Sequence, residues 1–184
     1  MPLPAPLARK HIHTRSIDCR GYEREDGLWD IEGHLTDAKT FSWWRKDSGA
    51  ALEPGEFVHD MWIRLTIDLD MMIHDVAVVT DTGPYARCGN IAPNFDALKG
   101  KTIRRGWTKA LRTAIGGVNG CTHLFELLGR VAVVAYQSTN AARALKRPLL
   151  PGEIPYQLGS CHIYTADSVE TRERWPQLKL GDST

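Results

Sequence analysis

The chain has 184 residues, of which 42% are hydrophobic and 24% are charged, and its formal net charge is +1. This length and composition are typical of one globular domain with a core of its own. Acidic and basic residues balance, and basic clusters such as Arg104-Arg105 and Lys146-Arg147 are short. We therefore expect neither nucleic acid nor a membrane as a partner.

The first ten residues contain three prolines, and their two basic residues come at the end. A secretion signal has the opposite order, with basic residues before an uninterrupted apolar segment. We expect 1–10 to be a flexible leader and 11–184 to be a single domain. No stretch approaches the ~18 apolar residues that cross a bilayer. The expectation is a cytoplasmic protein whose cysteines are reduced.

The N-terminal half has the period-two alternation of β-strands. Asp26-Gly27 is a hairpin-turn signal. Apolar and polar residues alternate after this turn, and the segment 12–22 before it is the expected antiparallel partner. The apolar face of the second strand comprises Trp29, Ile31, Gly33 and Leu35.

A second and clearer alternation covers 61–69, where isoleucine or leucine occupies every second position from Ile63 onward. A turn near Asp70–Met72 leads to another strand, which passes through Val76 and Val79. We expect these two strands to form a central hairpin of the sheet.

The C-terminal half has mostly helical spacing. A short helix is expected over 93–98, and apolar residues then recur every four positions over 107–115. A longer helix is expected from Cys121-Thr122, and a last strand over 157–164. Strands followed by helices predict an α+β fold. Its mainly antiparallel sheet, in the N-terminal half, is covered on one face by C-terminal helices.

Cys121 and His123 lie two residues apart at the expected start of the long helix. Thiol and imidazole groups bind soft and borderline metals, and they also perform nucleophilic chemistry. The free N–H groups and the dipole of a helix N-terminus favour a thiolate there. Both residues are therefore candidate ligands. The alternatives are a small buried cap residue for the cysteine and a bond to a backbone carbonyl for the histidine.

His59-Asp60 and Cys88 are further candidates. His59-Asp60 precede the strand 61–69, at a strand end where α+β sites often form, and the carboxylate can orient the imidazole. Cys88-Gly89 follow a Gly/Pro loop that lets the backbone approach a bound group. The alternatives are a loop pair that bonds local backbone and an inert loop thiol. Cys161-His162 lie in the expected last strand, so at most one of them faces a given site.

Four segments resemble the bacterial family catalogued as domain of unknown function 2889. They are the segments 25–37, 58–68, 120–124 and 160–162. This resemblance covers most of the chain and implies a single bacterial domain, without implying an activity.

Residues 60 to about 136 also resemble the iron–sulfur cluster assembly scaffolds of the NifU/IscU type. Asp60 matches the Asp of a Cys-Gly-Asp motif that leads into a strand. Cys88-Gly89 lie where those scaffolds have a Gly-Cys-Gly loop, and Cys121-Thr122 open the long helix as a His-Cys-Ser motif does. The resemblance implies an IscU-like α/β sandwich in which Asp60, Cys88 and Cys121 converge.

We therefore expect a metal site that binds zinc or an iron–sulfur species through five side chains: His59, Asp60, Cys88, Cys121 and His123. One alternative is an enzyme in which Cys121 is a nucleophile or sulfur acceptor and a histidine is its base. Another is a metal-free module that binds a small polar molecule. The expected partner is thus a metal ion or a small molecule, and the sequence gives no indication of the oligomeric state.

Overall fold

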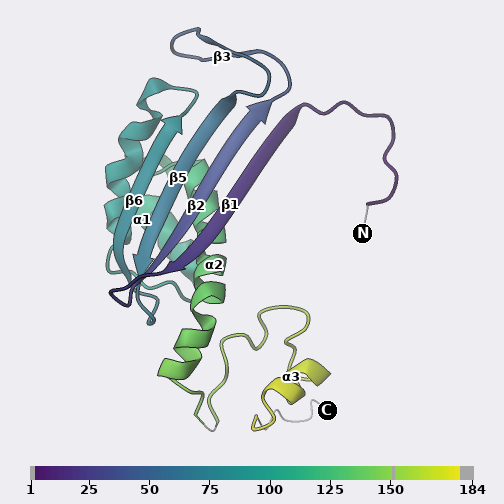
Figure 1. The fold of residues 1–184 in the computed structure, drawn as a ribbon, viewed down its shortest axis with the longest axis vertical. Helices are drawn as coiled ribbons and strands as arrows, with labels where there is room; N and C mark the ends of the chain where they lie inside the picture. The colour runs from purple at the N-terminus through teal and green to yellow at the C-terminus, as the bar shows by residue number, and fades with distance from the viewer. Residues whose placement is uncertain (1–2, 151, 179–184) are drawn as a thin grey trace. The chain divides into compact units, whose positions relative to one another are not determined.

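A computed structural model of the chain describes residues 3–150 and 152–178. By internal contacts the chain divides into two compact units, residues 1–140 and 141–184. In chain order, the strands, α-helices and 3-10 helices (η) are β1 (His13–Glu23), β2 (Trp29–Lys39), β3 (Trp43–Trp44), β4 (Ala51–Leu52), β5 (Phe57–Ile67), β6 (Ile73–Thr82), η1 (Ala86–Leu98), α1 (Trp107–Ile115), η2 (Gly117–Asn119), α2 (Thr122–Lys146) and α3 (Val169–Arg174). Most of them are labelled in Figure 1.

The first unit is built on a four-stranded antiparallel sheet with the strand order β1-β2-β5-β6. This confirms the α+β prediction and the pairing of the first two strands around Asp26-Gly27. The hairpin of β5 and β6 forms as well, but β6 is an edge strand. The expectation of a central hairpin is wrong for β6, because β2 pairs with the other side of β5 and makes β2–β5 the centre.

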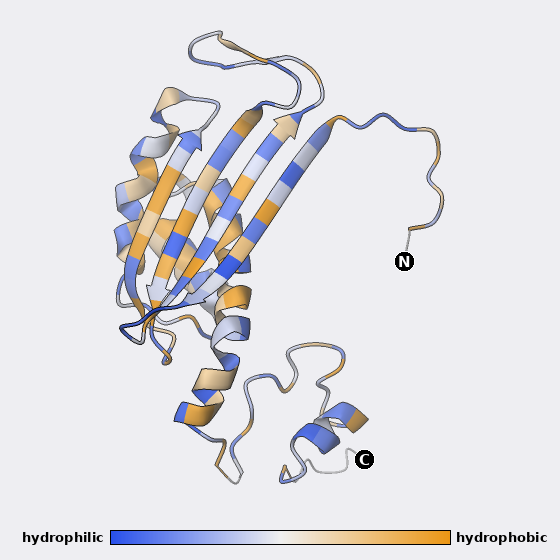
Figure 2. Ribbon diagram, in the orientation of Figure 1, coloured by the Kyte–Doolittle hydropathy of each residue, from blue (hydrophilic) through white to orange (hydrophobic). Residues whose placement is uncertain are grey.

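The predicted apolar faces of the strands are buried. Ile31, Leu35 and Leu65 have no exposed surface. They alternate with more polar residues that point to the opposite face, as the bands along β2 and β5 in Figure 2 show. Helices cover one face of this sheet (Figure 1). The core of the unit therefore lies in a single layer between the sheet and its helices.

Helix α2 lies close against the middle of the sheet. A Cβ atom on Gly33 of β2 would lie 2.6 Å from Val131 Cγ2 and 3.0 Å from Leu127 of α2. The expected helix over 107–115 is confirmed as α1, whereas η1 is longer than the expected 93–98. No helix in the described residues is long and apolar enough to cross a membrane. The buried residues of α2 include those that the sequence spacing indicated: Leu124, Leu127, Leu128, Val131 and Ala135.

The second unit has no strand among the residues that the structure describes. The strand expected over 157–164 is wrong, because this segment consists of turns and bends. The N–H of Gly159 donates to the carbonyl of Tyr164, and the N–H of Tyr164 donates to that of Cys161. Gly159 has a φ of 71°. The chain therefore folds back on itself here, and Cys161 and His162 are exposed.

Candidate metal centre

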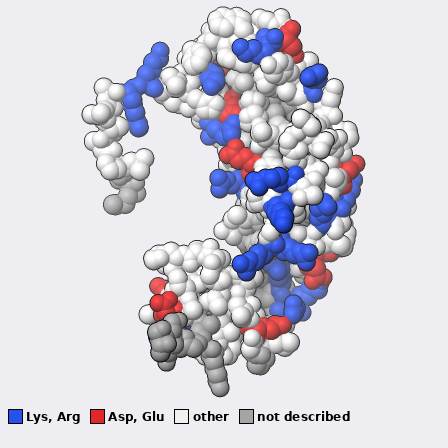
Figure 3. All heavy atoms as spheres, turned by 180° about the vertical axis from the view of Figure 1, so that it is seen from behind, with Lys and Arg blue, Asp and Glu red and all other residues white. Residues whose placement is uncertain are grey.

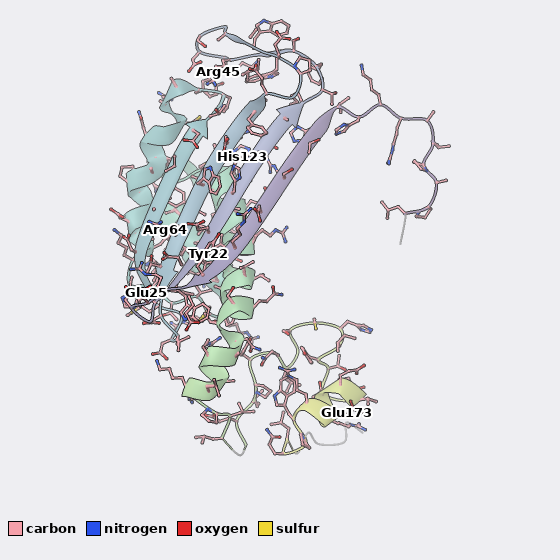
Figure 4. The ribbon with its side chains drawn as sticks, in the orientation of Figure 1. Tyr22, Glu25, Arg45, Arg64, His123 and Glu173 are labelled. Atoms are coloured by element: carbon pink, nitrogen blue, oxygen red, sulfur yellow. The ribbon has the colours of Figure 1, made fainter. Side chains whose placement is uncertain are left out.

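Three side chains with metal-binding atoms meet where β2 ends, β5 begins and α2 starts. They are Asp37, His59 and His123, and one ligand atom of each lies within 4.8 Å of the other two. Figure 4 marks His123 behind the sheet. Asp37 and His59 are paired residues of β2 and β5, and the register shifts directly after Asp37. Such bulges redirect side chains near sheet ends.

The Asp37 carboxylate is buried, with 2% of its side chain exposed, and is held by residues of β1. Arg15 donates from Nε to Oδ1 at 3.0 Å and from Nη2 to Oδ2 at 2.8 Å. His13 Nε2 lies 2.9 Å from Oδ1. Burial by itself would raise the pKa of Asp37, but the bonds and charge of Arg15 outweigh it and lower the pKa to about 2. The carboxylate is therefore ionised at neutral pH, as a metal ligand must be.

His59 contacts both other members of the group. Its Nδ1 lies 2.9 Å from Asp37 Oδ2, and its ring centroid lies 3.9 Å from that of His123. The Nδ1 contact lacks the geometry of a hydrogen bond, so Nδ1 is a buried nitrogen without a hydrogen-bond partner in the described part of the chain. Burial lowers the pKa of His59, and the nearby His123 lowers it further. His59 is thus a neutral imidazole at pH 7.

The start of α2 supplies His123 and, one residue before the helix, Cys121. Cys121 Sγ lies 3.7 Å from His123 Nδ1, and both side chains are half-buried. Burial lowers the pKa of His123, and the positive charge of Arg15 lowers it further. Arg15 also donates to Glu126, with 2.6 Å between Nη1 and Oε2. This ion pair joins β1 to the N-terminal part of α2.

The charges around the centre favour a cation. The Arg and carboxylate side chains that meet here are one guanidinium, Arg15, and two carboxylates, Asp37 and Glu126. The lowered pKa values keep His59 and His123 neutral. These residues together carry a net charge of −1, so a divalent cation between the two imidazoles and the Asp37 carboxylate is electrostatically favourable. The donor set therefore fits a metal that accepts nitrogen and oxygen ligands.

Two of the five ligands expected from the sequence belong to this group, and a third lies beside it. His59 and His123 meet, and Cys121 is adjacent. Cys88 does not belong to the group. It lies in η1 against Gly83, where an added Cβ would be 3.2 Å from Cys88 Sγ.

Asp60 lies on the other face of the sheet from His59. The two residues are neighbours in β5, and successive side chains of a strand point to opposite faces. Asp60 Oδ1 lies 2.7 Å from His34 Nε2. The His34 ring stacks on Trp62, with centroids 3.7 Å apart and an angle of 7° between the planes. A histidine, a carboxylate and an indole thus form a separate cluster opposite the candidate metal centre.

The carboxylate of the centre, Asp37, was not predicted as a ligand from the sequence, nor was Arg15. A usable signal was nevertheless present. The Asp26-Gly27 turn sets a register that pairs Arg15 with Asp37. Both lie on the same face as the buried Leu35. Charged residues are rarely buried unless they are paired, so two opposite charges facing each other on a core face indicate a built polar site.

Comparison with known proteins identifies the family. A family model described as "Protein of unknown function (DUF2889)" matches residues 13–137, so the chain belongs to this family. The match runs from β1 into α2 and includes every side chain of the candidate metal centre. No curated protein and no solved structure matches the chain. The comparisons therefore give no support to the resemblance to the NifU/IscU scaffolds.

Proposed function

We propose that this DUF2889 protein binds a zinc ion through Asp37, His59 and His123. The observation that carries the proposal is the convergence of their ligand atoms, within 4.8 Å of one another, from three separate elements of the fold. Ligands of a tetrahedral zinc at bond lengths near 2.0 Å are roughly 3.3 Å apart. Side-chain movements of roughly 1.5 Å or less therefore bring the three atoms around one ion.

Cys121 is the fourth ligand in this proposal. A sulfur and a nitrogen bound to one tetrahedral zinc, at about 2.3 and 2.0 Å, are roughly 3.5 Å apart. The distance between Cys121 Sγ and His123 Nδ1 is 3.7 Å. The thiol thus already has the required spacing to His123, and it must move closer to Asp37 and His59, because its sulfur is not within 4.8 Å of all three ligand atoms. A thiolate adds the negative charge that a divalent cation neutralises.

Arg15 and His13 position the carboxylate in this arrangement. A carboxylate offers about four lone-pair directions. Arg15 and His13 occupy both directions of Oδ1 and one of Oδ2. The remaining direction of Oδ2 faces His59 Nδ1, the nitrogen that has no hydrogen-bond partner among the described residues. A zinc ion on this side satisfies both atoms.

The donor set favours zinc over an iron–sulfur species. Iron–sulfur clusters are bound mainly by cysteine thiolates, and even the mixed centres use two cysteines with two histidines. Cys121 is a single thiol beside two imidazoles and one carboxylate. Zinc accepts such mixed ligands in tetrahedral sites.

Zinc content of the purified protein tests the proposal. After loading with zinc and removal of free metal under anaerobic conditions, the wild-type chain should retain about one zinc per chain, the occupancy of a single four-coordinate site. His59→Ala and His123→Ala should each lose most of it. The matched pair is Asp37→Asn and Asp60→Asn, which make the same chemical change on opposite faces of the sheet.

We expect Asp37→Asn to lose zinc and Asp60→Asn to retain it. If Asp60→Asn lost its zinc and Asp37→Asn retained it, the metal would lie on the other face of the sheet and the proposal would be overturned. Equal zinc content in the wild type and both histidine variants would overturn it as well. Circular dichroism of each variant separates loss of metal from loss of fold.

A second candidate function is thiol chemistry at Cys121. The observation that favours it is again the 3.7 Å between Sγ and His123 Nδ1, which allows the imidazole to accept the thiol proton. This function requires a metal-free protein with one fast-reacting thiol. Its activity would be lost in Cys121→Ser and retained after treatment with a chelator, whereas zinc binding responds to both.

A further inference from the structure

A cavity of about 200 Å³ lies beside Cys121, on the side of η2 and α1. Its lining combines glycines of the segment 116–120 with side chains of α1 and of the start of α2: Arg112, Ile115, Cys121, Thr122 and Phe125. One lining residue, Cys121, is the fourth ligand of the proposed zinc site, whereas the others lie outside the group formed by Asp37, His59 and His123. The cavity therefore borders the candidate metal centre at Cys121.

Glycine gives this cavity a wall of backbone. A Cβ atom on Gly120 would lie 1.9 Å from the carbonyl oxygen of Ile115, a contact that no side chain tolerates without a shift of the backbone. The space is therefore bounded by main chain on one side, and its apolar surface is Phe125, which is partly exposed, whereas the Ile115 side chain is buried in the core. Pockets with apolar walls and a few polar groups are typical of small-molecule sites.

Arg112 supplies the charge of the cavity. Its side chain is exposed and makes no ion pair with any residue that the structure describes. It is the charged residue among those that line the cavity. Figure 3 shows the helical side of the sheet, where Lys and Arg side chains are interspersed with Asp and Glu. A guanidinium group attracts anions.

We propose that this cavity binds a small organic carboxylate whose body is apolar or aromatic. The carboxylate group pairs with Arg112, as guanidinium groups do with planar oxyanions. The apolar body lies against Phe125, and Cys121 contacts the bound molecule. The proposal does not depend on the metal, since it requires only Arg112 and the cavity walls.

Alkylation of Cys121 tests the charge of the cavity. Iodoacetate and iodoacetamide differ in charge and are otherwise similar, so the ratio of their rates reports the electrostatics at the thiol. Rates are measured on metal-free full-length protein by mass spectrometry of the Cys121 peptide. Arg112→Ala should lower the iodoacetate-to-iodoacetamide ratio by about threefold, the effect of one charge roughly 6 Å away in water.

Lys109→Ala is the matched control, because Lys109 lies on the exposed surface of the same helix and does not line the cavity. It should leave the ratio unchanged. The exposed Cys161 of the second unit is an internal reference whose ratio should be the same in all variants. If the iodoacetate-to-iodoacetamide ratio at Cys121 were as low in Lys109→Ala as in Arg112→Ala, Arg112 would not be the specific source of charge in the cavity.

Protection by benzoate and by inorganic phosphate tests the ligand class. Benzoate at millimolar concentration should slow the reaction of Cys121 with neutral iodoacetamide in the wild type and not in Arg112→Ala. Phosphate, which has no apolar body, should protect much less. Equal protection by phosphate would overturn the carboxylate class, and absence of protection by benzoate would overturn the site.

Failure of this proposal and failure of zinc binding are distinguishable. Arg112→Ala should retain the zinc content of the wild type. Arg112 is not one of the proposed zinc ligands and only lines the cavity next to Cys121. Asp37→Asn should lose zinc and keep the protection by benzoate.

Discussion

Among single residues, Asp37 has the greatest influence on the candidate centre. It is buried, and Arg15 and His13 hold it in one orientation. The low pKa of the carboxyl group keeps it ionised. Its Oδ2 faces His59, so both orientation and charge are in place before a metal arrives. Such preorganisation by outer hydrogen bonds is common around metal ligands.

Core and site residues should respond differently to truncation. Leu65 has no exposed surface in the central strand β5, so Leu65→Ala should destabilise the protein by about 2–5 kcal/mol. His59→Ala should cost about 1 kcal/mol or less and abolish zinc binding, because His59 lies near a strand end and its buried Nδ1 makes no hydrogen bond among the described residues that would be lost. Urea unfolding of the metal-free variants measures both. Equal destabilisation would show that His59 is a structural histidine.

The sequence analysis named both imidazoles that meet in the candidate centre, and the adjacent Cys121, but missed the carboxylate. His59, His123 and Cys121 were found because they stand at the start of a strand and of a helix. The choice between Asp37 and Asp60 depends on which face each side chain points to. Strand alternation turns Asp60 away from His59 and, through the register of β2 with β5, places Asp37 opposite it.

At the scale of elements, the contact of β2 with α2 depends on Gly33. Gly33→Val should destabilise the protein by about 1–3 kcal/mol, because the added atoms would collide with Val131 and Leu127. Gly129→Ala on α2 is the control, since a Cβ there meets nothing within 4 Å. That change should stabilise the helix by about 0.5–1 kcal/mol. Thermal unfolding compares them, and a stable Gly33→Val protein would contradict this packing.

The β5–β6 turn should respond to pH through Asp68. Its carboxylate contacts His74 and accepts from the N–H groups of Asp70 and Met72. Burial would raise the pKa of Asp68, but these bonds hold it below its ordinary value. A lowered pKa stabilises the fold above the unfolded value of about 3.9, and this stabilisation is lost as the pH falls through the folded pKa.

Asp68→Asn should therefore be less stable than the wild type by about 1 kcal/mol at pH 6. The difference should shrink toward zero as the pH is lowered below the pKa of Asp68. Urea unfolding at a series of pH values measures it. A gap of constant size down to the most acidic condition would show that the ionised carboxylate is not what stabilises the turn.

The elements that were predicted correctly are those with a strong hydrophobic periodicity and a clear turn or glycine signal at one end. The strands around Asp26-Gly27 and the helix over 107–115 have both. The segment 157–164 has neither, because its apolar residues are few and Gly159 adopts a backbone conformation that ends extended structure. The position of β6 at the sheet edge could not be predicted from local periodicity, because it depends on β2 pairing with the other side of β5.

At the scale of the whole molecule, all residues of the candidate centre lie in the first compact unit, and the family match ends within α2. A chain that ends at Lys146 should therefore keep the zinc content of the full chain. Circular dichroism and zinc content of the shortened protein measure this. A folded but zinc-free product would show that residues 147–184 contribute to the site.

Both proposals use the start of α2. Cys121 contacts His123 and also lines the cavity beside Arg112. A thiol that is bound to zinc and also adjacent to a carboxylate site would link the two. The zinc site remains the central claim, because zinc binding is the proposed function.

Anomalous diffraction at the zinc edge from zinc-soaked crystals tests this claim most directly. We expect one strong peak enclosed by Asp37, His59 and His123, with metal–ligand distances of about 2.0–2.3 Å and Cys121 as the fourth ligand. A peak beside Asp60 and His34 on the opposite face, or no peak at full zinc loading, would contradict it.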